Sequence, residues 1–195
     1  TALAQGDFAS TMQSGHPGVI TMWLGSLGIR GQHALPAALP AFDPQNAEVA
    51  RFLAQYLDAA RLPVILVVAL NLVVLFLLLD RLIDRRAAFL AAGLIALDPF
   101  AVALGSVLHV DALMMTFSLN SLAALGVALN SQRAARWLMV SGGLAGLALL
   151  SKSPAAILGV AASIVIALDG VRQRRSVWQV MRRLFPRQSL RSQTR

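Results

Sequence analysis

The sequence contains no cysteine and carries about half of the charge that soluble domains hold. Without cysteine, disulfides, thiolate metal sites and a cysteine nucleophile are all excluded. Charged residues make up 13% of the 195 residues, against about 25% in soluble domains. Hydrophobic residues make up 57%, and the mean hydropathy is +0.67. This composition excludes a soluble globular protein and predicts that a lipid bilayer surrounds the chain.

The remaining charge is mostly positive, with 17 basic and 9 acidic residues and a net charge of +8. A pI near 11.7 would also fit a nucleic-acid-binding protein. The positive charge, however, lies in short clusters between apolar runs, as it does in the cytoplasmic loops of membrane proteins. We therefore expect the lipid bilayer as a partner and no nucleic acid.

The chain starts at Thr1 without Met or a basic n-region, and no apolar run precedes residue 62. It ends in a basic polar stretch. We expect no signal peptide and interpret the chain as an internal piece of a longer polytopic protein.

Two charge-free segments have the length of a membrane crossing. Residues 62–79 reach about 27 Å at 1.5 Å per residue, which is close to the hydrocarbon thickness. Residues 112–129 are also charge-free and long enough. Within the second segment, Ser118, Asn120 and Ser121 indicate that one face packs on protein.

The apolar segment 87–108 is interrupted by Asp98-Pro99. Asp as N-cap and Pro at the first helical position form a helix start signal, so we expect a broken span. An intramembrane Asp can also mark a functional site. Capping explains this Asp at lower cost.

The apolar segment 137–168 is too long for one crossing and is interrupted by Lys152. A lysine at the bilayer midplane costs about 2.5 to 3.5 kcal/mol, whereas a turn near the surface costs little. The sequence therefore favours two short crossings, at 137–150 and 154–168, or a re-entrant hairpin.

Arginine clusters predict the orientation of these crossings. Residues 80–86 hold three arginines, residues 130–136 hold two, and the tail 169–195 holds eight, whereas residues 105–111 hold none. Since basic loops lie on the cytoplasmic side, we expect an all-α polytopic bundle of about five crossings in the cell (inner) membrane. The extracytoplasmic side then holds the loop 1–61 and the Lys152 turn, and 169–195 is a basic cytoplasmic loop or tail.

Amphipathic helices are expected on both flanks of the crossings. Asp43-Pro44 starts a helix that we place along the outer surface, and Pro17 opens a similar stretch with Trp23 at the interface. In the tail, residues 177–185 have the pattern of a surface helix held by anionic lipid.

Six polar residues fall on the predicted outer side and carry charge or an imidazole, which would suit a phosphate-bearing lipid. Each has a simpler interpretation except Lys152, for which function is favoured. A boundary Arg often anchors a span, a lone His is often a hydrogen-bonded surface group, and an Asp before a span often caps it. The six residues are Asp7, His16, Arg61, His109, Asp111 and Lys152.

Five short motifs occur in the order seen in the dolichyl-phosphate-mannose protein mannosyltransferase family, and the chain resembles this family up to about Ala167. Its bacterial members and the lipid A aminoarabinose transferases are similar. The motifs are His16-Pro17-Gly18-Val19 with Met22-Trp23, Ala60-Arg61-Leu62-Pro63, Leu97-Asp98-Pro99-Phe100, His109-Val110-Asp111-Ala112-Leu113, and Gly146 to Pro154.

The resemblance implies a GT-C glycosyltransferase fold and transfer of a sugar from a polyprenyl phosphate to an extracytoplasmic acceptor. It implies that Lys152 and Arg61 bind the lipid phosphate and that His16, His109 and Asp111 shape the pocket. The family's acidic pair would fall before Thr1, so the catalytic base, an acidic residue, is expected upstream and Asp7 does not replace it. His-Pro-Gly stands where the family usually has His-Pro-Pro, which leaves the acceptor open.

We therefore predict a membrane glycosyltransferase with inverting chemistry. We expect the chain alone to be inactive. Its sequence shows no evident cofactor or metal site. The alternative is a polytopic transporter or membrane scaffold, in which Asp98 and Lys152 would mark a substrate or ion path.

Overall fold

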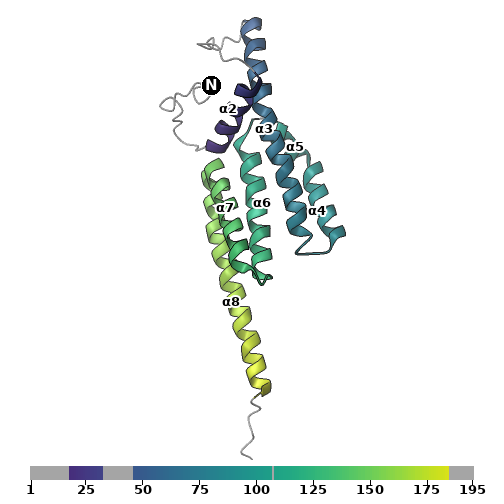
Figure 1. Ribbon diagram of the computed structural model, residues 1–195, viewed down its shortest axis with the longest axis vertical. Coiled ribbons are helices and arrows are strands. Elements are labelled where there is room, and N and C mark those ends of the chain that lie inside the picture. The colour runs from purple at the N-terminus through teal and green to yellow at the C-terminus, as the bar shows by residue number, and fades with distance from the viewer. Residues whose placement is uncertain (1–17, 33–45, 107, 185–195) are drawn as a thin grey trace, which may run out of the picture. The chain divides into compact units, whose positions relative to one another are not determined.

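The computed structural model describes residues 18–32, 46–106 and 108–184, and every element in these ranges is a helix, which confirms the predicted all-α fold. The chain divides into two units, residues 1–158 and 159–195, which we describe separately. The described helices are α2 (Val19–Gln32), α3 (Ala47–Leu79), α4 (Arg85–Leu97), α5 (Pro99–Ser106), α6 (Val110–Leu129), α7 (Ala134–Ser151), the 3₁₀ helix η2 (Ser153–Ala156) and α8 (Ile157–Leu184) (Figure 1).

The helix α3 begins well before the predicted crossing. Its N-cap is Asn46, whose Oδ1 accepts hydrogen bonds from the backbone N–H groups of Glu48 and Val49. This side chain pairs two of the N–H groups that a helix start leaves without partners. The expected start at Asp43-Pro44 lies outside the described residues.

The helix α3 is also continuous through Pro63. Its 33 residues reach about 50 Å, which is longer than a bilayer core. The sequence predicts a separate surface helix before residue 62, and this prediction is wrong because residues 47–61 belong to the same helix as the apolar run. A proline removes one backbone donor, and it ends a helix only where packing does not support the chain.

The pair α4–α5 confirms the predicted break at Asp98-Pro99. The two helix axes differ by 57°. The Asp98 carboxylate accepts hydrogen bonds from the backbone N–H groups of Phe100 and Ala101, and Asp98 therefore caps α5. This structural role accounts for an acidic residue inside an apolar segment.

The central helix of unit 1 is α6, since 61% of its candidate span is buried, against 22% for α3 and 17% for α7. It runs parallel to α3: Val64 and Leu113 share one apolar cluster, and Leu78 and Val127 share another. Between these clusters, Asn120 Nδ2 donates to the backbone oxygen of Asn71 at 3.0 Å and to its Oδ1 at 2.7 Å. A residue of α3 thus lies level with the residue 49 positions later in α6.

The helix α7 runs antiparallel to α6 and contacts it closely. Ser121 Oγ donates to the backbone oxygen of Ser141, and Ser141 Oγ donates to that of Ser121, each at 2.9 Å. Small hydroxyl side chains let two helices approach and pair their polar groups in an apolar surrounding. Asn120 and Ser121 are buried in these contacts, which confirms the prediction that this face packs on protein.

By length and composition, four helices in the described part of the chain can cross a membrane, or five if α4–α5 forms one span. The outward faces of α3 and α4 are correspondingly apolar, with Leu66, Leu70, Phe89 and Leu94 each more than half exposed. A soluble protein rarely exposes so much contiguous apolar surface. Lipid solvates such a surface.

The helix α8 holds the last candidate span, Ser153–Val171 together with η2, and continues to Leu184. The sequence predicts a crossing at 154–168 and a separate surface helix over 177–185. The structure has one helix instead, because no proline interrupts residues 157–184 and each added residue of a helix contributes a hydrogen bond. Phe185 lies outside the described residues.

Candidate functional site

The first turn of α6 places His109 and Asp111 at one end of the bundle. His109 is the N-cap, and its Nδ1 accepts a hydrogen bond from the backbone N–H of Asp111 at 3.2 Å. Asp111 Oδ2 lies 3.4 Å from the same nitrogen. The interpretation of Asp111 as the cap is therefore wrong, because α6 starts two residues earlier than the sequence predicts. Asp111 lies in the first turn, where the helix dipole favours a negative charge.

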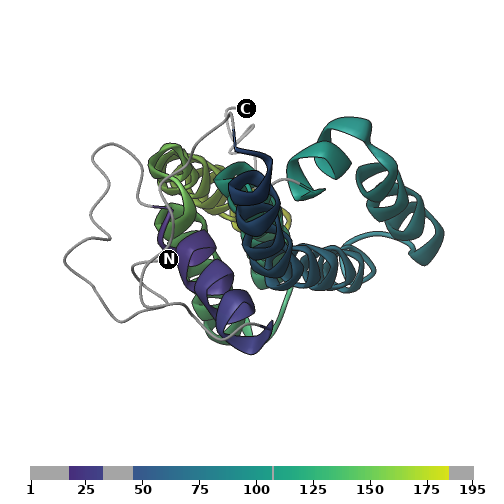
Figure 2. The same cartoon turned by 90° about the horizontal axis from the view of Figure 1, so that it is seen from above.

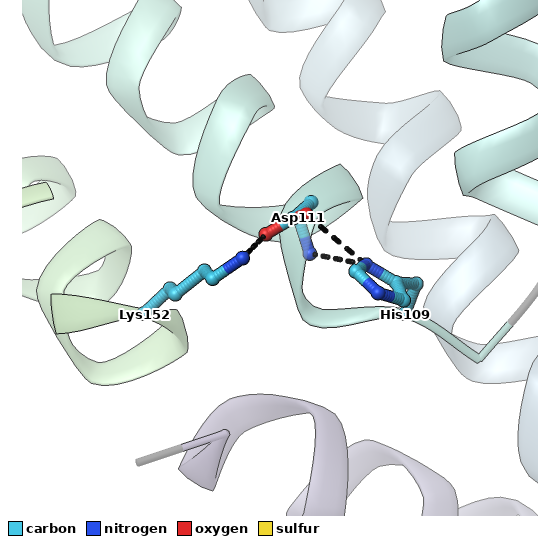
Figure 3. A network of polar contacts seen from close by, with 3 residues as sticks. All are labelled: His109, Asp111 and Lys152. Carbon is cyan, nitrogen blue, oxygen red and sulfur yellow. Dashed lines mark hydrogen bonds and ion pairs between the residues drawn. The ribbon is translucent and has the colours of Figure 1, made fainter. Parts of the chain in front are cut away.

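An ion pair between Lys152 and Asp111 joins the end of α7 to the start of α6 (Figure 3). Lys152 Nζ donates to Asp111 Oδ1 at 2.5 Å. The two side chains are 22% and 27% exposed. Lys152 follows α7 as its C-cap with extended backbone, which ends the helix and lets the side chain reach α6. With water partly excluded, each charge depends on the other for neutralisation. We call His109, Asp111 and Lys152 the polar cluster.

Arg61 lies at the same end of the bundle. The parallel register of α3 and α6 places it level with Val110. Its Nη1 donates to Asp58 Oδ1 at 3.0 Å, one turn earlier in α3. Its Nε is buried without a hydrogen-bond partner in the described part of the chain. Arg61 therefore has at least one buried N–H group without a partner among the described residues.

The helix α2 packs beside this end of the bundle (Figure 2). Ile20 and Leu24 pack against the apolar cluster that contains Leu113 and Ala148, from α6 and α7. Ile29, further along α2, is buried with Tyr56, Ala59 and Ala60 of α3. In Figure 3, α2 passes beneath the polar cluster. The site thus has a helical wall on one side, built from the first described segment of the chain.

An apolar cavity of about 250 Å³ lies among α3, α4, α5 and α6. Ile65, one turn after Arg61, and Ala112, directly after Asp111, both line it. The remaining walls include Val102 and Gly105 from α5. The bend at Asp98 holds α5 at an angle to α4, so the cavity results from the broken span. A hydrocarbon chain fits the chemistry of these walls.

The structure brings together three of the five residues that the sequence predicts for the site. His109, Asp111 and Lys152 form the polar cluster, and Arg61 lies level with it without an ion pair to it among the described residues. His16 lies outside the described residues, as does Asp7. Within residues 18–32, 46–106 and 108–184, no group of three or more His, Asp or Glu side chains could hold a metal ion.

Sequence reasoning missed Asp58 and the contact between α2 and α3. Asp58 lies three residues before Arg61, a spacing at which opposite charges pair on a helix, so this partner was detectable. The predicted separate surface helix before residue 62 obscures this pairing, because it sets Asp58 apart from the boundary of the span at Arg61. The spacing of Gly25 and Gly28 places both on one face of a helix. The sequence near them does not show that this face packs on α3.

The chain matches a protein-family model. Residues 49–188 match the model described as dolichyl-phosphate-mannose-protein mannosyltransferase, and this range covers most of the chain. It includes Arg61 and the whole polar cluster and leaves out His16. No curated protein and no solved structure matches the chain.

Proposed function

The chain belongs to the dolichyl-phosphate-mannose-protein mannosyltransferase family, a family of membrane glycosyltransferases, and we propose on this premise that it transfers a sugar from a polyprenyl-phosphate donor to an extracytoplasmic acceptor. The observation that carries the proposal is the part-buried Lys152–Asp111 pair together with an apolar cavity that Ala112, the residue after Asp111, lines. A lipid phosphate needs both features, since its head is anionic and its tail is a hydrocarbon.

In this proposal, Lys152 and Arg61 bind the phosphate group of the donor. Lysine and arginine form charge-assisted hydrogen bonds to phosphate oxygens. Each already has a carboxylate neighbour, Asp111 or Asp58, which orients the cation before the donor arrives. His109 fixes the turn that carries Asp111 and thereby shapes the pocket.

The apolar cavity takes the first part of the donor's lipid chain. Its walls begin within one turn of Arg61 and directly after Asp111, so a phosphate at these residues would place its tail against Ile65 and Ala112. The outward faces of α3 and α4 would solvate the rest of the chain together with the bilayer.

The proposed reaction is an inverting displacement at the anomeric carbon. The acceptor hydroxyl oxygen bonds to that carbon, the bond from the carbon to the phosphate oxygen breaks, and polyprenyl phosphate leaves with the electron pair. The hydroxyl proton passes to an acidic residue, which we place upstream of Thr1. Lys152 and Arg61 stabilise the charge that develops on the leaving phosphate.

The test is sugar transfer by the full-length protein, measured with a polyprenyl-phosphate sugar. Lys152→Ala and Arg61→Ala should each lower the transfer rate by about a hundredfold or more, since electrostatic stabilisation of a developing anion has that value per donor. The matched controls Arg133→Ala and Arg136→Ala remove exposed arginines at the other end of the bundle and should change the rate less than about twofold.

Equal expression of all four variants is needed for the comparison. Transfer at the natural rate by both Lys152→Ala and Arg61→Ala would refute the phosphate assignment. A natural-sequence protein that moves a solute and transfers no sugar would favour the transporter alternative.

A further inference from the structure

At one position, α2 lies closer to α3 than any side chain would allow. A Cβ atom at Gly28 would overlap the backbone oxygen of Ala59 and would lie 2.9 Å from Pro63 Cδ and Cγ. At Gly25, a Cβ would lie at an ordinary 3.5 Å from Ala60 Cβ. At Gly31, nothing lies within 4 Å. Of these three glycines, Gly28 alone is required by the packing of the two helices.

Gly28 approaches the backbone oxygen of Ala59. Pro63 leaves this oxygen without the N–H donor that an α-helix normally supplies. Proline has no N–H, so the carbonyl group four residues earlier, that of Ala59, receives no hydrogen bond from position 63. Ala59 is only 1% exposed, and water has little access to it. The Cα hydrogen of Gly28 that stands in place of a Cβ points at this oxygen and offers a weak hydrogen bond. The contact also supports the continuation of α3 through its proline.

The same helix α2 packs against the residues that flank the polar cluster. Leu24 packs on the cluster that contains Leu113, two residues after Asp111, and Ala148, one turn before Lys152. Leu108, which precedes His109, packs against both this cluster and the contact around Ala59. A displacement of α2 would therefore reach the three residues of the polar cluster through residues one to four positions away from them in the sequence.

We propose that Gly28 is a positioning residue for the transfer reaction. It docks α2 on the Ala59 carbonyl group, and the docked α2 holds one wall of the polar cluster in place throughout the reaction. The effect on transfer rests on the proposed function, whereas the docking can be measured without any activity.

The docking is tested by disulfide formation in the full-length membrane protein between Gly25→Cys and Ala60→Cys. This chain has no natural cysteine, and the Cβ separation of 3.5 Å falls within the range of disulfides, about 3.5 to 4.5 Å. We expect rapid cross-linking with Gly28 present and much slower cross-linking after Gly28→Ala. Gly31→Ala is the matched control, because it replaces another glycine of α2 by the same better helix former and meets open space. Equal cross-linking rates in the Gly28→Ala and Gly31→Ala proteins would overturn the docking.

The positioning role is tested by steady-state transfer kinetics without the cysteines. Gly28→Ala should lower kcat on the order of a hundredfold, as a displacement of about 1 Å can, and should change KM for the donor much less. Arg61, a proposed phosphate ligand outside the polar cluster, still binds the donor in this variant, which limits the effect on KM. Gly31→Ala should keep the natural kcat.

Two outcomes separate this proposal from the proposed function. A Gly28→Ala protein that cross-links slowly but transfers with the natural kcat would overturn the positioning role. If the natural protein transfers no sugar, the proposed function fails, and the cross-linking rates alone decide whether Gly28 docks α2.

An oxidised Gly25→Cys/Ala60→Cys protein that loses transfer and regains it on reduction would show that α2 must move, which contradicts a fixed wall.

Discussion

The two ends of the helical bundle in unit 1 differ in the partners of their charged side chains. At the end that holds the polar cluster, Lys152 pairs with Asp111 and Arg61 pairs with Asp58. At the opposite end, which we call the arginine end, Arg81 lies over the Trp137 ring at 4.9 Å. The other arginine side chains there form no ion pair within the described part of the chain, and all are exposed: Arg85, Arg86, Arg133 and Arg136.

Under the proposed function, this difference would separate charges that serve the site from charges that orient the protein in the membrane. Exposed arginines at a membrane surface are solvated by water and anionic lipid headgroups, so they need no partner in the protein. A part-buried lysine in an apolar surrounding needs a carboxylate. The ion pair between α6 and α7 therefore marks the proposed functional end more sharply than a count of basic residues does, since the arginine end has more of them.

The largest expected difference between the two ends is their accessibility from opposite sides of the membrane. Ser153 lies beside the polar cluster, Gln132 lies at the arginine end, and both residues are exposed. The test uses the variants Ser153→Cys and Gln132→Cys. In oriented membranes, a charged impermeant maleimide should label Ser153→Cys only from the extracytoplasmic side and Gln132→Cys only from the cytoplasmic side. A permeant maleimide should label both. Labelling of both from one side by the impermeant reagent would break the comparison.

A charge exchange tests whether the Lys152–Asp111 pair is structural or functional. Asp111→Lys and Lys152→Asp each place like charges together and should lower the free energy of unfolding by about 1 to 3 kcal/mol, less than for a fully buried pair. The double variant restores an ion pair and should recover most of that stability. Transfer should remain lost in Lys152→Asp and in the double variant, since the proposed phosphate ligand must sit at the end of α7.

The measurements for this exchange are unfolding in detergent and sugar transfer by the full-length protein. Arg133→Asp at the arginine end is the matched control and should change stability by less than about 0.5 kcal/mol. If the double variant transfers sugar at the natural rate, the pair has only a structural role.

Local signals predicted a large part of this fold. Apolar runs without charge identify the crossings in α3 and α6 because insertion into lipid depends on composition alone. The break at Asp98 follows from its cap and the adjacent proline, which act within one turn. The polar face of α6 was also predictable, since Asn120 and Ser121 in an apolar run need partners on protein.

The contacts between helices were not predictable from the sequence. The Lys152–Asp111 pair joins residues 41 positions apart and depends on the register of α6 against α7. Gly28, which lies against Ala59 and Pro63 of α3, stands 35 positions before Pro63 in the sequence. The sequence shows that each of these groups needs a partner. The packing of the helices determines which residue becomes that partner.

The smallest expected effect comes from the Asn71–Asn120 pair, which links the two ends by fixing the register of α3 against α6. Asn120→Leu leaves the Asn71 side-chain oxygen without its donor and should lower the free energy of unfolding by about 1 kcal/mol, the usual size for interhelical hydrogen bonds in membranes. Asn71→Leu should have a similar effect. The double variant should cost less than the two single variants together, because neither amide is then left unpaired. Leu70→Val, on the exposed face of the same helix, is the control, and strictly additive losses in the asparagine variants would show that the two side chains do not couple.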